Sequence, residues 1–285
     1  MSNGKRYYLD TNVIYAISSK LGNINSNNVA VSLLVLWEIL SGVTNQSTFQ
    51  RRKPVVEKLR RSKVRVYPYL PVECLAIAFK VDLSEIGSIP NQKEEIFKQM
   101  NIICISKDYE EYIDNLHQED IDIASIMENE KKQESFIRES LNIENKQQQI
   151  ELKLQKQRRD EKTEYYVTNT DDLFLDTRDE YQIYEPILQE ILDVCNFSYT
   201  VDEFKKCLNA YDGSLTAYLL GVNLYAFERG RHGDQVHRND YTDIKHLLYL
   251  RSENDIIVSN DTIYTKLALP HQHMKVDEFE KIFGL

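Results

Sequence analysis

Short apolar runs alternate with amphipathic segments over the first 80 residues of the chain. Strands are predicted at 5–9, 29–32 and 64–67, because each run is short and apolar and ends at a polar residue or proline. Helices are predicted at 10–20, 33–40, 46–61 and 71–79, and Pro54 marks a point where the third could break. The resulting order, β-α-β-α-α-β-α, indicates a parallel sheet covered by helices.

This α/β pattern stops near residue 80 and resumes near residue 236. In between, residues 81–90 are predicted to be irregular, 92–99 helical, 102–105 a strand or buried helix, and 109–162 long exposed helices. Further helices are predicted at 178–195, 201–211 and 214–229, before a turn at 229–233. A helix at 240–250, a strand at 256–259 and helices at 261–269 and 277–283 follow. We therefore predict a discontinuous α/β domain, residues 1–80 and 236–285, interrupted by a mostly α-helical insertion, residues 81–235.

The composition is typical of a globular protein. Of the 285 residues, 42% are hydrophobic, and no apolar run approaches the ~20 residues that a membrane span needs. Residues 1–6 do not resemble a signal peptide. The four cysteines are scattered, so we expect reduced thiols, a cytoplasmic location and no zinc site. His271 and His273 could bind a metal, but a surface loop after Pro270 explains them more simply.

Charge is unevenly distributed along the chain. The net charge of −10 by itself disfavours contact with nucleic acid. Residues 51–65 depart from this balance, because Glu57 is their only acid. Their basic side chains, which we predict to contact a nucleic acid backbone, are Arg51, Arg52, Lys53, Lys58, Arg60, Arg61, Lys63 and Arg65. A solvated helix face is the alternative explanation.

Carboxylates stand at the ends of several predicted elements. Asp10 directly follows the first predicted strand, and Asp261 lies two residues after Ser259 at the end of the last. The carboxyl ends of parallel strands share one edge of a sheet, where ligand sites form. Glu38 lies within an apolar helix, where a carboxylate is costly to bury unless a cation meets it. A position that faces water would also explain Glu38.

Asp240 and Asp243 form a further acidic pair. Their i, i+3 spacing places them on one face near the start of a predicted helix. Helix capping would explain this pair, and Asp10 as well, without any site. Acids from four separate elements at one sheet edge would repel one another without cations, and hard oxygen ligands suit Mg²⁺ or Mn²⁺. One or two such ions can activate water for phosphodiester hydrolysis.

Four segments, taken in order, resemble the PIN-domain ribonuclease pattern. They are Leu-Asp-Thr-Asn-Val at 9–13, Val-Ser at 31–32 with Glu38, the helix headed by Asp243, and Val-Ser-Asn-Asp at 258–261. Each motif alone is short, and their order and strand–helix context make the set specific. The resemblance covers the two α/β pieces and leaves residues 81–235 unmatched.

The resemblance implies a PIN-like three-layer α/β/α fold with a central parallel sheet and a metal-dependent endonuclease acting most often on RNA. The metal-binding acids that it implies are Asp10, Glu38, Asp243 and Asp261, with Asp240 as an alternative or helper. The residues that it implies as hydrogen-bonding partners of ligands or water are Thr11, Asn12 and Ser259. The family includes toxins of toxin–antitoxin pairs. The long insertion favours a regulated effector, for example in defence against phage, that binds a protein partner or a second copy through it.

Three alternatives stay open at this point. The same acids could serve a DNA nuclease. A catalytically inactive PIN-like binding or scaffold protein would be expected to lack some site acids, and here all four positions are filled. A haloacid-dehalogenase-like phosphatase also begins with an acid after the first strand, but it needs a second Asp at the position of Asn12.

Overall fold

The structure, a computed structural model, describes residues 4–82, 88–119, 121, 146, 188, 191, 200–232, 240–267 and 271–285. Its centre is a five-stranded sheet in which every pair of neighbouring strands is parallel. The strands are β1 (Arg6–Leu9), β2 (Val29–Ser32), β3 (Arg65–Tyr67), β4 (Asp255–Val258) and β5 (His273–Met274). The chain is therefore an α/β protein, as the sequence predicted.

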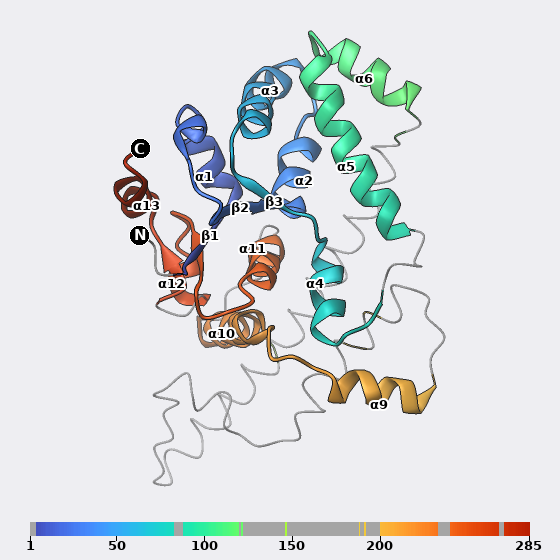
Figure 1. The fold of residues 1–285 in the computed structure, drawn as a ribbon, viewed down its shortest axis with the longest axis vertical. Coiled ribbons are helices and arrows are strands. Elements are labelled where there is room, and N and C mark those ends of the chain that lie inside the picture. Colours follow the sequence, from blue (N-terminus) through green and yellow to red (C-terminus); the bar gives the residue numbers. More distant parts are fainter. Residues whose placement is uncertain are drawn as a thin grey trace.

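Helices separate and follow these strands. Those before residue 120 are α1 (Thr11–Ala16), η1 (Leu21–Asn23), α2 (Leu33–Ser41), α3 (Gln46–Arg61), α4 (Pro71–Ala78), α5 (Ser88–Ile105) and α6 (Tyr109–Gln118). Those after residue 200 are α9 (Val201–Asn209), α10 (Thr216–His232), α11 (Asp240–His246), η3 (Leu247–Tyr249), α12 (Tyr264–Leu267) and α13 (Val276–Phe283). Figure 1 shows α2, α3 and α5 on one side of the strands and α10 and α11 on the other.

The strand order is β3-β2-β1-β4-β5. The chain moves outward from β1 through β2 to β3 and later returns to the other side of β1 with β4. The boundary between β1 and β4 is therefore the point where the order reverses, and open α/β sheets bind ligands outside the carboxyl ends of the strands at such a point. Asp10 follows β1 and Ser259 follows β4, so both lie at this boundary.

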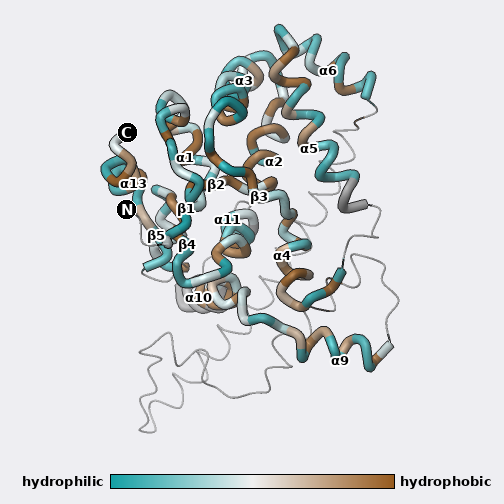
Figure 2. Tube along the Cα trace, viewed as in Figure 1, coloured by the Kyte–Doolittle hydropathy of each residue, from teal (hydrophilic) through white to brown (hydrophobic). Residues whose placement is uncertain are grey.

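One hydrophobic core joins the sheet to helices from both predicted parts of the chain. Strand residues such as Leu9, Val31 and Ile257 are fully buried in it. Ile103 of α5 and Tyr225 of α10 belong to the same core, although both lie in the predicted insertion. Figure 2 shows apolar stretches on α2 and α4. The described helices of the predicted insertion thus pack on the α/β part. That the insertion forms a separate unit stays a prediction.

Two predicted helices are shorter in the structure, and a third keeps its predicted bounds. Helix α1 ends at Ala16 rather than Lys20, because residues after Ile17 turn instead of continuing the helix. Helix α12 spans four residues, since the Asp261 carboxylate accepts the Ile263 N–H and holds a turn before the helix begins. Helix α3 runs unbroken through Pro54.

The largest corrections fall near residues 88–105, 229–232 and 273. Residues 88–90 belong to the helix α5 and not to an irregular stretch, and the apolar run 102–105, predicted as a strand or a buried helix, is the last part of the same helix. The turn expected from Arg229 is wrong, because α10 continues to His232. His273 is not in a surface loop but in β5, which pairs with β4. Two residues are too few to show strand periodicity.

Other predictions fall partly or wholly outside the described residues. The exposed helices at 109–162 are described only as α6 and at residues 121 and 146, and the helix at 178–195 only at residues 188 and 191, both helical. Within the described parts of the chain, no helix combines the length and apolarity needed to cross a membrane. Cys74, Cys104 and Cys207 are free thiols.

Candidate metal centre

Asp10 joins the end of β1 to the start of α1. Its backbone is extended, and its carboxylate accepts the Thr11 N–H at 2.6 Å as the N-cap of the helix. The other carboxylate oxygen accepts a hydrogen bond from Ser259 Oγ at 2.8 Å. The capping explanation for Asp10 is therefore correct, and the same bonds aim the buried carboxylate at the edge between β1 and β4.

Glu38 reaches the same place from α2. Ser32 caps this helix at its start, accepting the Val35 N–H, so α2 begins directly at the end of β2. The Glu38 carboxylate accepts a hydrogen bond from the Thr11 hydroxyl. Behind it, the Arg52 guanidinium of α3 donates to the Glu38 and Ile39 carbonyls at 2.7 and 2.6 Å. Glu38 thus turns into the site and does not simply face water.

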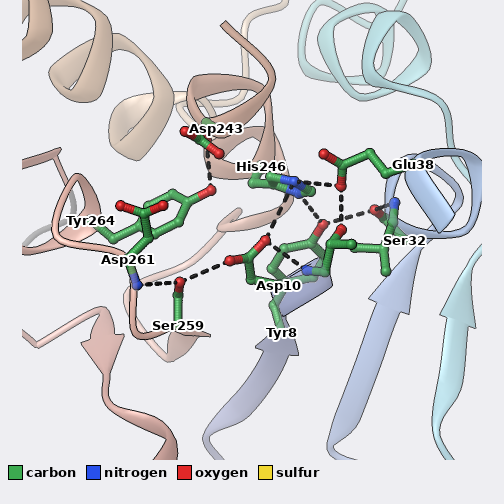
Figure 3. A network of polar contacts seen from close by, with 11 residues as sticks. Tyr8, Asp10, Ser32, Glu38, Asp243, His246, Ser259, Asp261 and Tyr264 are labelled. Atoms are coloured by element: carbon green, nitrogen blue, oxygen red, sulfur yellow. Dashed lines mark hydrogen bonds and ion pairs between the residues drawn. The ribbon is translucent and has the colours of Figure 1, made fainter. Parts of the chain in front are cut away.

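His246 is the cation that meets Glu38. It is the last residue of α11 and is fully buried. Its Nε2 lies 3.1 Å from Glu38 Oε2 and 3.7 Å from Asp10 Oδ1. Its Nδ1 is hydrogen-bonded to Tyr8 Oη at 2.6 Å, and Tyr8 Oη is bonded to Ser32 Oγ at 2.8 Å (Figure 3).

Asp243 lies one helical turn before His246 on α11 and faces the same group of acids (Figure 3). Burial raises the pKa of Asp243 to about 8, and the charges of Asp10, Asp261 and Glu38 add to this effect while His246 opposes it. Its backbone carbonyl accepts the Tyr264 hydroxyl. Among the described residues, no hydrogen bond to its carboxylate is found.

Asp261 and Asp240 differ in how they relate to this group. Asp261 follows β4, and its N–H donates to the same Ser259 hydroxyl that holds Asp10. The carboxylate of Asp240 instead accepts the Tyr225 hydroxyl of α10 at 2.5 Å. Of the two acids on α11, Asp243 is therefore the one coupled to the other site acids.

The charges of the central group are strongly coupled. Burial raises the pKa of Asp10, against the opposing effects of His246 and Ser259. Burial also acts to raise the pKa of Glu38, but His246 outweighs it together with Thr11 and Arg52, so this pKa is lowered. Burial acts to lower the pKa of His246, yet Glu38, Asp10 and Asp243 raise it to about 9.

The predicted nucleic-acid contacts divide into two groups. Arg52 binds the α2 carbonyls, and Lys53 donates to the Ser106 carbonyl, so these two point partly into the protein. The side chains that are exposed to solvent are Arg51, Lys58, Arg60, Arg61, Lys63 and Arg65. Arg52 therefore supports the Glu38 backbone instead of offering its charge to a ligand.

Among the described residues, Asp10, Glu38 and His246 form a group that could hold a metal ion, and the predicted acids Asp243 and Asp261 do not belong to it. One potential ligand atom from each member of the group lies within 4.8 Å of the others. Thr11 and Ser259 contact the group as predicted, while Asn12 is exposed and, within the described residues, makes no hydrogen bond to these acids. The sequence analysis did not single out His246; its position three residues after Asp243 was the available signal, because i, i+3 residues share a helix face.

Comparisons with known proteins found no relative: no family model, no curated protein and no solved structure matches the chain. What can be said of its function therefore depends on the geometry of this site.

Proposed function

We propose that the chain is a PIN-type, metal-dependent endonuclease that hydrolyses phosphodiester bonds, with RNA as its favoured substrate. One observation carries this proposal. Four acids gather at the reversal point of a parallel sheet: Asp10 and Glu38 lie in one group with His246, and the charges of Asp10, Asp261 and Glu38 act on buried Asp243. The PIN-like resemblance of the sequence supports it, since the same four acids fill the resembling positions.

The residues present fit a divalent cation. The site holds four acids and a single imidazole, so negative charge is in excess, and the raised pKa of Asp243 reflects burial together with that excess. Bound here, Mg²⁺ or Mn²⁺ would activate water and stabilise charge on the phosphate. Asp10, Glu38 and Asp243 would hold the ion, and Asp261 would hold it or a second one. The Ser259 and Thr11 hydroxyls keep the first two carboxylates in place.

The exposed basic side chains between Arg51 and Arg65 would hold the substrate backbone. Phosphate contacts of this kind position a nucleic acid without reading its sequence. A protein partner or second copy bound through residues 81–235, and a role as a toxin or in phage defence, stay predictions beside this activity.

Cleavage of a fluorescent single-stranded RNA tests the proposal. The wild-type chain is expected to cleave with Mn²⁺ or Mg²⁺ and to stop in EDTA. The double variant Asp10→Asn/Asp261→Asn should lose cleavage, whereas Asp114→Asn/Asp277→Asn, which changes two exposed acids by the same charge, should retain it. Undiminished cleavage by the first variant would contradict the site. A single-stranded DNA of the same sequence separates a ribonuclease from a DNA nuclease.

One observation favours the alternative of an inactive PIN-like binding protein. His246 already bridges Glu38 and Asp10, and a charged imidazole between two acids can serve as a structural countercharge. Under this alternative the wild-type chain binds RNA but does not cleave it with either metal, and the Asp10→Asn/Asp261→Asn variant binds RNA equally well.

A further inference from the structure

The site contains a nitrogen atom that an all-oxygen metal site does not require. His246 Nε2 points between two of the acids, 3.1 Å from Glu38 Oε2 and 3.7 Å from Asp10 Oδ1 (Figure 3). These three side chains come from α11, α2 and the end of β1. An imidazole that served only as core packing would not need to face the centre of a carboxylate group.

The other ring nitrogen is anchored in a way that fixes the imidazole. His246 Nδ1 is bonded to Tyr8 Oη, and Tyr8 Oη is bonded to Ser32 Oγ, with all three side chains fully or almost fully buried. If Nδ1–H donates to Tyr8 and Tyr8 donates to Ser32, Nε2 is the nitrogen that faces the acids, and a metal ion that displaces its proton to solvent would bind the Nε2 lone pair there. A hydrogen-bonded partner on the remote nitrogen is a regular feature of metal-binding histidines.

The fold adds rigidity to this chain of bonds. Tyr8 stacks on Tyr249 of η3 with ring centroids 5.2 Å apart and planes 8° apart, and η3 directly continues α11. The ring of Tyr8 therefore contacts both the histidine and the segment that carries it. These contacts hold the imidazole in one orientation, and a metal site binds best when its ligands are preorganised in this way.

We propose that His246 Nε2 binds the same divalent cation as Asp10 and Glu38, and that this nitrogen ligand makes the site prefer a first-row transition ion over Mg²⁺. Imidazole ligands favour transition ions, whereas Mg²⁺ strongly prefers oxygen. The inference deepens the proposed function, on which it rests only in assuming that a divalent cation binds at this group. It names His246 as a ligand in addition to the carboxylates and narrows the class of cofactor.

Pulsed EPR of Mn²⁺ bound to the full chain tests the ligand directly. The protein, whose six histidines are labelled with ¹⁵N, is expected to show ¹⁵N coupling to bound Mn²⁺. His246→Gln should remove this coupling, and His271→Gln, which alters an exposed histidine, should leave it intact. Bound Mn²⁺ without nitrogen coupling, or no Mn²⁺ binding by the wild-type chain, would overturn the inference.

Mn²⁺ titrations with Mg²⁺ as competitor test the preference. His246→Gln is expected to lower Mn²⁺ affinity about tenfold or more and Mg²⁺ affinity less, so that the ratio of the two affinities falls. An equal loss for both ions would overturn the preference. Tyr8→Phe provides a second variant if His246→Gln does not fold, because it should weaken Mn²⁺ binding while the ¹⁵N coupling persists.

The outcomes separate this inference from the proposed function. Nitrogen coupling without RNA cleavage would leave the His246 site standing and remove the nuclease proposal. Metal-dependent cleavage without nitrogen coupling would do the reverse, and His246 would then act as a countercharge to the acids.

Discussion

The two halves of the acidic site are held in different ways. Asp10 and Glu38 accept hydrogen bonds from Ser259, Thr11 and other donors, and His246 supplies a positive charge between them. Asp243 is buried beside the same acids, and its pKa is raised to about 8. The protein itself therefore compensates the charge of Glu38 and part of that of Asp10, whose pKa burial still raises, whereas Asp243 keeps its charge only at a larger cost in free energy. A bound cation would stabilise the Asp243 half most.

The largest effects are expected from replacing one acid in each half of the site. Glu38→Gln and Asp243→Asn are each expected to reduce RNA cleavage about 100-fold or more, beyond the 10–100-fold typical of residues that only support a ligand. Their effects on stability should be opposite. Glu38→Gln removes the nearest charge partner of His246 and should lower the Tm of the metal-free protein, whereas Asp243→Asn relieves repulsion and should raise it.

Initial cleavage rates and thermal unfolding of the two variants in EDTA measure these effects. Exposed Asp114→Asn serves as the control for loss of one negative charge. Equal shifts in Tm for the two site variants would contradict the conclusion that the protein compensates the charge of one acid and not that of the other.

The metal-free protein should lose stability as pH rises from about 5 to 9. Asp243 has a folded pKa of about 8, above its ordinary value, so the folded state holds its proton longer and loses stability as that proton leaves. His246 has a folded pKa of about 9, so its contribution is complete below about pH 6.5 and is lost as pH rises through 9. Both shifts have the same sign in this window.

Thermal unfolding in EDTA at intervals between pH 5 and 9 measures this dependence. The Tm difference between Asp243→Asn and the wild-type chain is expected to widen as pH rises, and added Mn²⁺ should reduce it. A difference that stays constant over the whole range would show that the Asp243 carboxyl has no raised pKa.

Arg52 should contribute a smaller effect through the backbone of Glu38. Arg52→Met removes the donors to the Glu38 and Ile39 carbonyls and is expected to cost about 2 kcal/mol of unfolding free energy together with part of the cleavage rate. Arg52→Lys should restore part of both.

Urea unfolding and cleavage rates report on these variants. Lys53→Met is the neighbouring control, since Lys53 binds the Ser106 carbonyl away from the acids. A loss of cleavage in Lys53→Met equal to that in Arg52→Met would show that α3 acts only through overall stability.

The smallest effect is expected at the exposed end of α3. Charge reversal at Arg60 and Arg61 should weaken RNA binding and reduce its salt slope by about 1 for each lost phosphate contact, with stability changed by less than about 0.5 kcal/mol. Fluorescence anisotropy with single-stranded RNA at several salt concentrations measures the slope. Lys281→Glu, on α13, is the control; an unchanged slope for the Arg60/Arg61 variant would mean that this helix end is only a solvated face.

The strands and most helices of the α/β part follow from local sequence. Val29–Ser32 is fully buried as its apolar run predicts, and Ser32 ends the strand because its side chain caps α2. Asp10 and Ser259 could be assigned to one edge because parallel strands share their carboxyl ends. The sequence also indicated that buried Glu38 requires a cation.

Only the tertiary structure showed that the cation beside Glu38 is His246. Tyr8 and His246 lie 238 positions apart, and no local periodicity links them. The same holds for the choice between Asp240 and Asp243, which depends on the Tyr225 hydroxyl of a separate helix. It also holds for Arg52 and Lys53, whose neighbours on α2 and after α5 turn two apparent surface charges inward. Residue type and spacing determined which groups could form a site, and packing between distant elements determined which of them meet.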